Sequence, residues 1–501
     1  MRIVFASAEV APYARVGGLS DVVGALPKEI AELGHEPIVF LPLYASVDRR
    51  THGIEPVAGL GSLSVPMGDA VEEVALHTAT MPGAPGVRVF FIEHEGAFGR
   101  EGIYVDPATG HGYPDEVERF ALLSRALLES LVALDLTPDV IHLNDHHTAF
   151  AAAYLRELYE DTPLSNAGIV FSIHNLAYLG TFEASRLPGI GFPRKACVSG
   201  SPFDYKGQVS ALKLGIEYAD FVSTVSERYA IEISTDPKYG HGLEGVLAKK
   251  RERGRLSGIL NGVDYSVWDP SVDPLIPSQY SASDMGGKTR CRRALVERTG
   301  LVESDGPIIG IVSRLADQKG FDLIHEVADE IVALGTRLVV LGTGQPEYHE
   351  FLTELSEQHT GLVSVSLAFD NGLAHWIEAG SDMFLMPSLY EPCGLNQMYS
   401  LRYGTVPVVR ATGGLVDTVE DFDAVEGTGV GFVFEPYTSG AMLEAIERAV
   451  STYDDGGAWG GIVRRGMALD FSWRASAERY LDLYERAASG PGKSPEVGLS
   501  A

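Results

Sequence analysis

Short apolar runs alternate with amphipathic stretches along most of this chain, and that alternation restricts its fold more than any other feature. The runs of the first half are rich in β-branched residues and have the length of buried strands. They cover residues 3–6, 37–41, 87–92, 140–143, 168–173 and 221–224. Helical periodicity lies between them, as in residues 21–33 and 118–133. Buried strands joined by crossover helices form parallel sheets, so the pattern predicts a doubly wound α/β domain.

The same pattern starts again in the second half of the chain. A second series of buried strands is expected at residues 307–312, 336–341, 363–366, 383–386 and 406–409, with a helix over residues 321–334. No repeat at a fixed period is present, which excludes solenoids and propellers. The sequence therefore predicts two doubly wound α/β domains, residues 1–256 and 257–470. A stretch rich in Gly, Pro and Ser predicts a disordered tail over residues 488–501.

Charge and cysteine content exclude several classes of partner. The formal net charge is −29, and such a protein is repelled by phosphate backbones and anionic lipid. We therefore expect no nucleic acid and no membrane as partner. No signal peptide and no transmembrane run of about 18 apolar residues is found. Three cysteines form no paired disulfide framework, so we expect a cytoplasmic protein.

Two glycine-rich turns each follow a predicted strand and precede a predicted helix. The first contains Arg15, Gly17 and Gly18, and its helix is expected to open at Ser20-Asp21; the second contains Thr412 and Gly413. Such a turn allows backbone N–H groups to approach an anion, which the helix start also attracts. A simple strand-to-helix turn explains the first pair of glycines equally well, and both interpretations stay open.

Polar side chains also end two neighbouring strands of the first series. Asp145 follows one of these strands and His174 ends the next, so we expect them side by side, where they would bind sugar hydroxyls. His146 and His147 make a metal site conceivable. Adjacent residues of a strand end point in opposite directions, however, and no second carboxylate completes a ligand set. We therefore expect no metal here.

Charged residues follow two strands of the second series. Arg314 and Lys319 are both expected to point at one diphosphate, which a guanidinium clamps and an ammonium attracts. Glu391 lies at the apex of a later turn, where it would accept sugar hydroxyls or offset positive charge at a reacting carbon; an acidic surface loop is the equal alternative. Cys393 has no base nearby in the sequence, so we interpret it as a packing residue. For Asn261 a tight Asn-Gly turn is the favoured interpretation.

Together these segments closely resemble bacterial glycogen synthase and plant starch synthase, over residues 2 to about 486. The resemblance is carried by Gly17-Gly18-Leu19, His174-Asn175-Leu176-Ala177-Tyr178, Ile259-Leu260-Asn261-Gly262, Ser313-Arg314-Leu315 with Lys319-Gly320, Glu391-Pro392-Cys393-Gly394-Leu395 and Thr412-Gly413-Gly414-Leu415. It implies a GT-B fold, with two Rossmann-like doubly wound domains facing across a cleft. It also implies that the first domain serves the acceptor, that the second serves the nucleotide-sugar donor, and that a helix over residues 471–487 crosses back to the first domain.

The resemblance further implies a retaining transfer of glucose from ADP-glucose to the non-reducing end of an α-1,4-glucan, with no metal and no other cofactor. Asp145, His174 and Glu391 would lie at the reacting sugars. The implied donor-binding residues are Arg15, Gly17, Gly18, Asn261, Arg314, Lys319, Cys393, Gly394, Leu395, Thr412 and Gly413. The oligomeric state is not indicated.

Several residues depart from the family pattern in segments expected near the substrates. They are Arg15 for Lys, Glu116 for Asn, Asn144 for His, His146 for Trp, Leu179 for Gln and Leu389 for Arg. These departures keep two alternatives open: a GT-B glucosyltransferase that uses UDP-glucose or another acceptor, and a non-catalytic glucan-binding paralogue. The catalyst is favoured by the joint presence of five residues: Asp145, His174, Arg314, Lys319 and Glu391.

Overall fold

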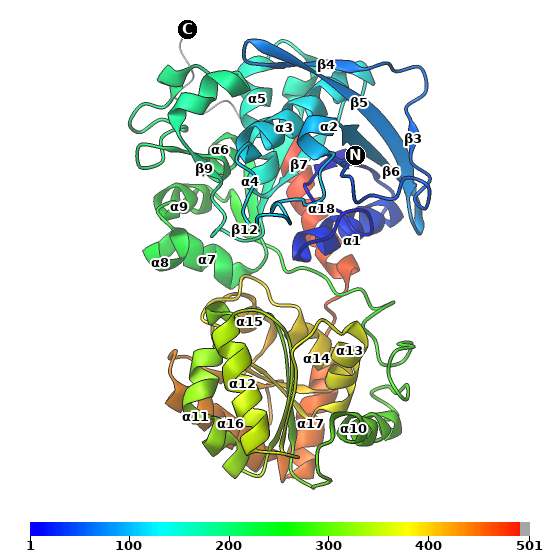
Figure 1. Ribbon diagram of the computed structural model, residues 1–501, viewed down its shortest axis with the longest axis vertical. Coiled ribbons are helices and arrows are strands. Elements are labelled where there is room, and N and C mark those ends of the chain that lie inside the picture. Colours follow the sequence, from blue (N-terminus) through cyan, green and yellow to red (C-terminus); the bar gives the residue numbers. More distant parts are fainter. Residues whose placement is uncertain (491–501) are drawn as a thin grey trace. The chain divides into compact units, whose positions relative to one another are not determined.

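The computed structural model describes residues 1–490, which divide into two compact units (Figure 1). The first unit comprises Met1–Val225, Ala230–Ile259 and the C-terminal segment from Trp473, and the second comprises Ser226–Tyr229 and Leu260–Ser472. Each unit contains its own sheet. The boundary predicted between residues 256 and 257 falls inside β12 (Leu256–Gly258), a strand of the first sheet that is too short to show a periodicity.

The first unit is built on a ten-stranded sheet in the order β12-β11-β8-β7-β1-β2-β6-β5-β3, with β4 paired to β5. Its strands are β1 (Arg2–Ala6), β2 (Glu36–Pro42), β3 (Glu55–Pro56), β4 (Leu63–Met67), β5 (Ala70–Met81), β6 (Ala84–Glu93), β7 (Val140–Asn144), β8 (Gly168–Ile173) and β11 (Phe221–Thr224), with β12. Pairing is parallel from β12 to β6, and antiparallel among β3, β4, β5 and β6. The predicted strands are present, whereas β3, β4, β5 and β12 were not predicted.

Helices cover the sheet of the first unit. They are α1 (Gly18–Glu32), α2 (Glu95–Phe98), α3 (Glu116–Ala133), α4 (Asp145–Thr148), α5 (Phe150–Leu158), α6 (Ala211–Tyr218), α7 (Glu227–Thr235), α8 (Pro237–Gly240), α9 (Glu244–Glu252) and α18 (Trp473–Ser489). A two-stranded sheet of β9 (Thr181–Phe182) and β10 (Val209–Ser210) lies beside them. Helix α1 begins at Gly18, two residues before the predicted opening. Ser20 therefore lies inside the first turn, where its hydroxyl donates to the Gly17 carbonyl at 2.7 Å, and it is not the N-cap.

The last described helix, α18, packs on the first unit. The Tyr484 hydroxyl contacts Nδ1 of His142 on β7 at 2.8 Å, and both side chains are buried. Gly168 opens β8 at a place where a Cβ would lie 2.4 Å from the Ala487 carbonyl oxygen, so only glycine allows this approach. The disordered tail is predicted from residue 488, but α18 extends to Ser489. Residues 491–501, which hold the rest of that predicted tail, lie outside the described residues.

The second unit is built on a six-stranded, all-parallel sheet in the order β15-β14-β13-β16-β17-β18. Its strands are β13 (Ile308–Val312), β14 (Arg337–Leu341), β15 (Val363–Ser366), β16 (Met383–Met386), β17 (Val406–Arg410) and β18 (Phe432–Phe434). Its helices are α10 (Gly286–Thr299), α11 (Phe321–Ala333), α12 (Pro346–Gln358), α13 (Asn371–Gly380), α14 (Asn396–Tyr403), α15 (Gly413–Thr418), α16 (Ser439–Tyr453) and α17 (Gly456–Met467).

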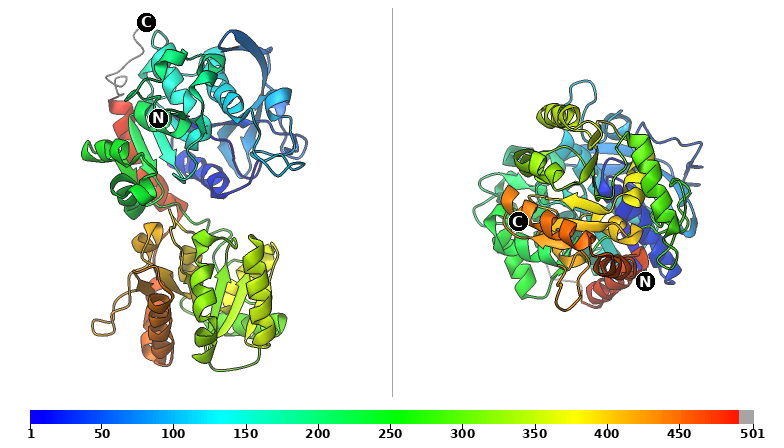
Figure 2. Two further views of the ribbon diagram at one scale, coloured as in Figure 1. Left: turned by 60° about the vertical axis from the view of Figure 1, so that its left-hand side comes forward. Right: turned by 90° about the horizontal axis from the view of Figure 1, so that it is seen from below.

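Helices lie on both faces of this second sheet (Figure 2). Ile309 and Ile311 of β13 pack in one apolar cluster with α11, α12 and α16, whereas Ile308 packs in another with α10 and α13. Successive residues of a strand point to opposite faces, so a sheet covered on both sides needs the continuous apolar runs seen in the sequence. This is the doubly wound arrangement predicted from the alternating pattern. No described helix is long and apolar enough to span a membrane.

Candidate functional site

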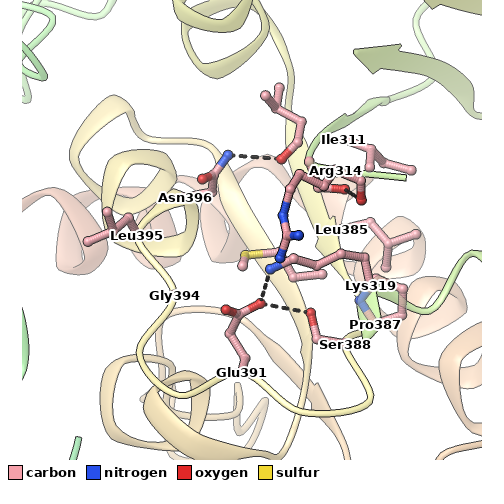
Figure 3. A pocket seen from close by; sticks show the side chains of 13 residues that line it. Ile311, Arg314, Lys319, Leu385, Pro387, Ser388, Glu391, Gly394, Leu395 and Asn396 are labelled. Atoms are coloured by element: carbon pink, nitrogen blue, oxygen red, sulfur yellow. Dashed lines mark hydrogen bonds and ion pairs between the residues drawn. The ribbon is translucent and has the colours of Figure 1, made fainter. Parts of the chain in front are cut away.

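A cavity of about 220 Å³ lies at the carboxyl ends of β13 and β16 in the second unit (Figure 3). Ligands of open α/β sheets bind at this edge, where the loops after the strands converge. The lining contains five of the predicted site residues: Arg314, Lys319, Glu391, Gly394 and Leu395. The second unit therefore gathers both predicted cations and the predicted carboxylate in one place.

An ion pair joins two loops at this cavity. Lys319 Nζ lies 2.6 Å from Glu391 Oε2, and the Ser388 hydroxyl donates to the same oxygen at 3.1 Å. The two charged side chains are only 18% and 9% exposed. Gly320 follows Lys319 with φ +77°, and a Cβ there would lie 2.2 Å from the Pro387 carbonyl oxygen. Glycine is thus required for the close packing that holds Lys319 beside Glu391.

Arg314 keeps most of its donor capacity. Its Nη2 lies 3.5 Å from Gln318 Oε1, at the limit of a hydrogen bond. A guanidinium offers five N–H donors, so the group is available to a bidentate anion such as a diphosphate.

The second Gly-Gly turn supports the loop of Glu391. Gly413 has φ +46°, and a Cβ there would lie 1.9 Å from the Glu391 carbonyl oxygen. The Gly414 N–H donates to that same carbonyl at 3.1 Å. Thr412 is buried, and its hydroxyl oxygen has no partner within the described chain. This turn therefore shapes the carboxylate loop and does not itself line the cavity.

Cys393 and Asn261 lie behind the cavity wall. Burial raises the pKa of the Cys393 thiol to about 12, so the sulfur stays protonated and is no nucleophile at neutral pH. The Asn261 backbone contacts this thiol, and Asn261 Oδ1 is buried without a partner among residues 1–490. The packing role expected for Cys393 agrees with these contacts.

The first unit brings Asp145 and His174 together, as the strand order predicted. Asp145 follows β7 with φ +55°, a left-handed conformation that is uncommon for residues other than glycine and costs free energy. In this conformation Asp145 Oδ1 accepts the His174 N–H at 2.8 Å. A strained backbone at a strand end is typical of functional sites.

Asn144 fixes the tautomer of His174. The Asn144 Nδ2 group donates to the Ala6 carbonyl at 3.0 Å, so Asn144 Oδ1 is left to accept from His174 Nε2 at 2.9 Å. Burial lowers the pKa of His174, which keeps the ring neutral at pH 7. A neutral ring with its proton on Nε2 offers Nδ1 as an acceptor, which is suited to a sugar hydroxyl.

Glu9 is a site residue that the sequence reasoning missed. Its carboxylate accepts the N–H groups of Val16 and Gly17 at 2.5 and 2.7 Å and the Tyr104 hydroxyl at 2.6 Å. These two N–H groups are therefore engaged, and an anion at this turn would reach the first N–H groups of α1, which has no side-chain cap. A Glu just after the apolar run of residues 3–6 was the signal available in the sequence.

Open space surrounds the first Gly-Gly pair, in contrast to the second. No atom lies within 4 Å of a Cβ built on Gly17 or Gly18, and neither has a positive φ. Neither backbone strain nor packing inside this protein requires glycine at these two positions. This favours the interpretation that the glycines leave space for a ligand. Arg15 is 68% exposed and pairs with Asp21 at 3.0 Å.

An aromatic side chain is exposed at the same edge of the second sheet as the cavity. Phe369 follows β15 and is 92% exposed. Large apolar side chains are seldom so exposed without a partner, and a flat ring at this edge could stack on a nucleobase. Nothing in the sequence distinguishes Phe369, because one Phe in a loop carries no pattern.

The orientation expected for His146 and His147 is wrong. Both lie in the helical turn α4 and not in an extended strand end, and their ring centroids are 3.7 Å apart. Consecutive helical residues diverge by about 100°, so two neighbouring rings can meet. A carboxylate is also present, because Glu116 Oε1 lies 3.4 Å from His146 Nε2. Two departures from the family pattern, Glu116 and His146, thus contact each other.

A buried histidine makes the first unit sensitive to acid. Burial lowers the pKa of His142 to about 3, against about 6.5 in an unfolded chain. As the pH falls, the unfolded state therefore takes up the proton before the folded state does. This group lowers the free energy of unfolding by about 1.4 kcal/mol per pH unit between pH 6.5 and 3. We expect His142→Gln to reduce that slope by about half a proton at pH 6.5 and by nearly one proton at pH 5.5, measured as the urea-unfolding free energy at pH 7.5, 6.5 and 5.5. An unchanged slope would contradict a buried neutral His142.

Comparisons with known proteins match this chain over nearly its whole length. Residues 2–249 match the family model of the starch synthase catalytic domain, and residues 296–458 match glycosyl transferases group 1. The glycogen synthase of Koribacter versatilis is 44% identical over 97% of this chain and 98% of its own. That of Anaeromyxobacter dehalogenans is 46% identical over 97% of this chain and 100% of its own.

Solved structures give the same result. The catalytic domain of starch synthase IV from Arabidopsis thaliana, bound to ADP and acarbose, superposes with a TM-score of 0.86 at 34% identity, over 98% of this chain and 99% of that one. A sucrose-phosphate synthase from Thermosynechococcus elongatus has a TM-score of 0.59 at 17% identity, over 97% of this chain and 99% of that one, and so shares the fold.

Proposed function

The chain belongs to the glycogen synthase family of glycosyltransferases with the GT-B fold, and we propose that it transfers glucose from ADP-glucose to the non-reducing end of an α-1,4-glucan. The observation that carries this proposal is the Lys319–Glu391 pair beside Arg314, in a cavity at the carboxyl edge of the second sheet. Support for the adenine nucleotide is the ADP bound to the Arabidopsis relative.

In the proposed reaction the second unit binds the donor. Arg314 and Lys319 meet the charge that develops on the departing diphosphate, and preorganised cations in a partly dry cavity are effective there. Glu391 accepts glucose hydroxyls and offsets positive charge at the anomeric carbon. We assign no covalent nucleophile, since Cys393 is buried and protonated and Glu391 is engaged by Lys319 and Ser388.

The first unit is proposed to act on the same sugars. Neutral His174 accepts a hydrogen bond from a sugar hydroxyl at Nδ1, and Asp145 holds the His174 backbone while placing a negative charge near the reacting carbon. Arg15 and the start of α1 add positive charge for the diphosphate. We propose that Arg15, Arg314 and Lys319 supply the positive charge for the leaving group and that transfer needs no metal. We also propose that the enzyme is cytoplasmic.

Product analysis tests the proposed activity. Glycogen is incubated with ADP-[¹⁴C]glucose and the enzyme, and the labelled polymer is digested with an exo-acting α-1,4-glucanase. We expect the label to enter the polymer and to leave as maltose. Label that remains in the polymer after this digestion would show another linkage. Label that appears as free glucose before the digestion would show hydrolysis of ADP-glucose without transfer.

Arg15 provides a prediction about donor affinity. Because this guanidinium is exposed and paired only at the surface, Arg15→Ala should leave stability nearly unchanged and raise the KM for ADP-glucose about tenfold. Arg15→Lys should change the same KM less, since the charge stays but the planar fork is lost. The control is Arg88→Ala, another exposed arginine paired with a glutamate. Donor KM and kcat equal to wild type in both Arg15 variants would remove Arg15 from the site.

Phe369 provides a second prediction about the donor. If its exposed ring stacks on the nucleobase, Phe369→Ala should raise the KM for ADP-glucose about tenfold, and Phe369→Tyr should restore it, because stacking is worth about 1–3 kcal/mol per base. Val425→Ala is the matched control, since Val425 is 91% exposed in the same unit. Steady-state kinetics with varied donor measure the effect. A donor KM in Phe369→Ala equal to that of wild type would show that the ring does not contact the base.

A further inference from the structure

We propose that Glu116, His146 and His147 form a binding site for one divalent transition-metal ion, with Zn²⁺ as its natural probe. The three residues lie in the first unit, two of them in α4 and one at the start of α3. The proposal does not depend on the transfer reaction, for which none of the three is assigned a role.

The three side chains converge within ligand distance. One ligand atom from each lies within 4.8 Å of the others. Glu116 Oε1 lies 3.4 Å from His146 Nε2. Ligand atoms about 2.0–2.2 Å from a tetrahedral zinc ion lie roughly 3.3–3.6 Å apart, so closing the site needs a movement of at most about 1.5 Å. Glu116 can supply it, because its side chain is 39% exposed.

Unpartnered nitrogen atoms point to a ligand. His146 and His147 are only 8% and 7% exposed, yet Nδ1 of each ring is buried without a hydrogen-bond partner among the described residues. Buried polar atoms are nearly always bonded, and each exception calls for an explanation. Because Nε2 of His146 is the atom that faces Glu116, an ion would bind this ring through Nε2 and leave its buried Nδ1 to carry the proton. Two imidazoles beside one carboxylate have the composition of a transition-metal site.

The rings are held in place before any ion arrives. His147 stacks on Tyr104 at a centroid distance of 4.7 Å and meets Phe120 edge-on at 4.6 Å. His146 packs against Gly180, where a Cβ would come within 2.7 Å of the ring. A site whose ligands are fixed by packing loses little side-chain entropy on binding.

The chemistry of the site selects the kind of ion. Two imidazoles and one carboxylate suit Zn²⁺, Co²⁺ or Ni²⁺ better than Mg²⁺ or Ca²⁺, which prefer oxygen. Three protein ligands leave a fourth position for water, and the exposed edge of Glu116 gives access from solvent. The Arg119 guanidinium acts electrostatically on His147 and opposes a cation, so we expect micromolar rather than picomolar affinity.

Metal binding to the full chain tests the proposal directly. Protein stripped with a chelator is titrated with Zn²⁺ against a chromophoric indicator, and with Co²⁺ while visible absorption is recorded. We expect one ion per chain, together with cobalt d–d bands of low-coordinate geometry. Glu116→Gln should weaken binding about 10- to 100-fold, and His146→Gln should abolish the cobalt bands. Zn²⁺ should also raise the unfolding temperature of wild type but not of His146→Gln.

His359→Gln is the matched control. His359 also pairs with one carboxylate, Asp329, at 2.6 Å, but belongs to no three-ligand group among residues 1–490. Its replacement should leave stoichiometry and affinity unchanged. Absence of Zn²⁺ binding to wild type, or equal binding by wild type and Glu116→Gln, would overturn the proposal. The second outcome stays decisive even if His146→Gln fails to fold, because Glu116 is partly exposed and its replacement is isosteric.

Discussion

Replacement of Glu391 by Gln is expected to lower the turnover of glucosyl transfer about 100- to 1,000-fold, while the KM for ADP-glucose changes much less. The amide fits the same space but carries no negative charge to offset the positive charge that develops at the anomeric carbon. Preorganised electrostatic groups contribute effects of this size. Lys319→Met should lower turnover comparably, because it removes the ammonium that meets the diphosphate and orients Glu391 at 2.6 Å. Turnover at saturating donor and glycogen is the quantity measured.

Loss of turnover must be separated from loss of stability. Each Lys319 or Glu391 variant leaves one charge of a largely buried pair without its partner, which is destabilising. The double variant Lys319→Met/Glu391→Gln should therefore recover stability but not activity. Asp382→Asn is the control, since Asp382 pairs with Arg292 at 3.1 Å and precedes β16, at the amino end of the same sheet. It should lose stability and keep turnover. Wild-type turnover in Glu391→Gln would remove Glu391 from the site.

Asp145→Asn is expected to reduce turnover about 100-fold with little loss of stability. Asn adopts the left-handed conformation of Asp145 readily and still accepts the His174 N–H, so only the charge is removed. Asp145→Ala should lose both the charge and the acceptor and also unfold at a lower temperature, because alanine at φ +55° costs about 1–2 kcal/mol. Turnover and thermal unfolding are compared for both variants. Equal turnover in wild type and Asp145→Asn would show that the charge of Asp145 plays no part.

Much of the fold could be predicted from the sequence, because the signal is local. Buried parallel strands such as Gly168–Ile173 and Met383–Met386 are continuous apolar runs, and their observed bounds equal the predicted ones. Strands β4 and β5 were missed, because one face of this antiparallel edge meets solvent and its residues alternate instead of forming runs. Strand β12 was missed because it has only three residues, and the predicted domain boundary therefore falls inside it.

The site was harder to predict, because its contacts join distant segments. That Arg314, Lys319 and Glu391 follow strands was visible, but the direct bond between Lys319 and Glu391 depends on two loops 72 residues apart. The role of Glu9 depends on a turn that folds back onto it. The orientation of His146 and His147 was predicted wrongly because both lie in a helical turn of four residues, which is too short to show a helical pattern in the sequence.

Nucleotide release from ADP-glucose and from UDP-glucose, each with and without glycogen and in excess chelator, tests the central claim most directly. The chelator also removes any ion from Glu116, His146 and His147, so it separates that site from transfer. The account predicts ADP release that requires glycogen, persists in the chelator and exceeds UDP release. Preference for UDP-glucose or release without glycogen would contradict the proposed donor or acceptor, and no release from either donor would contradict a catalytic role.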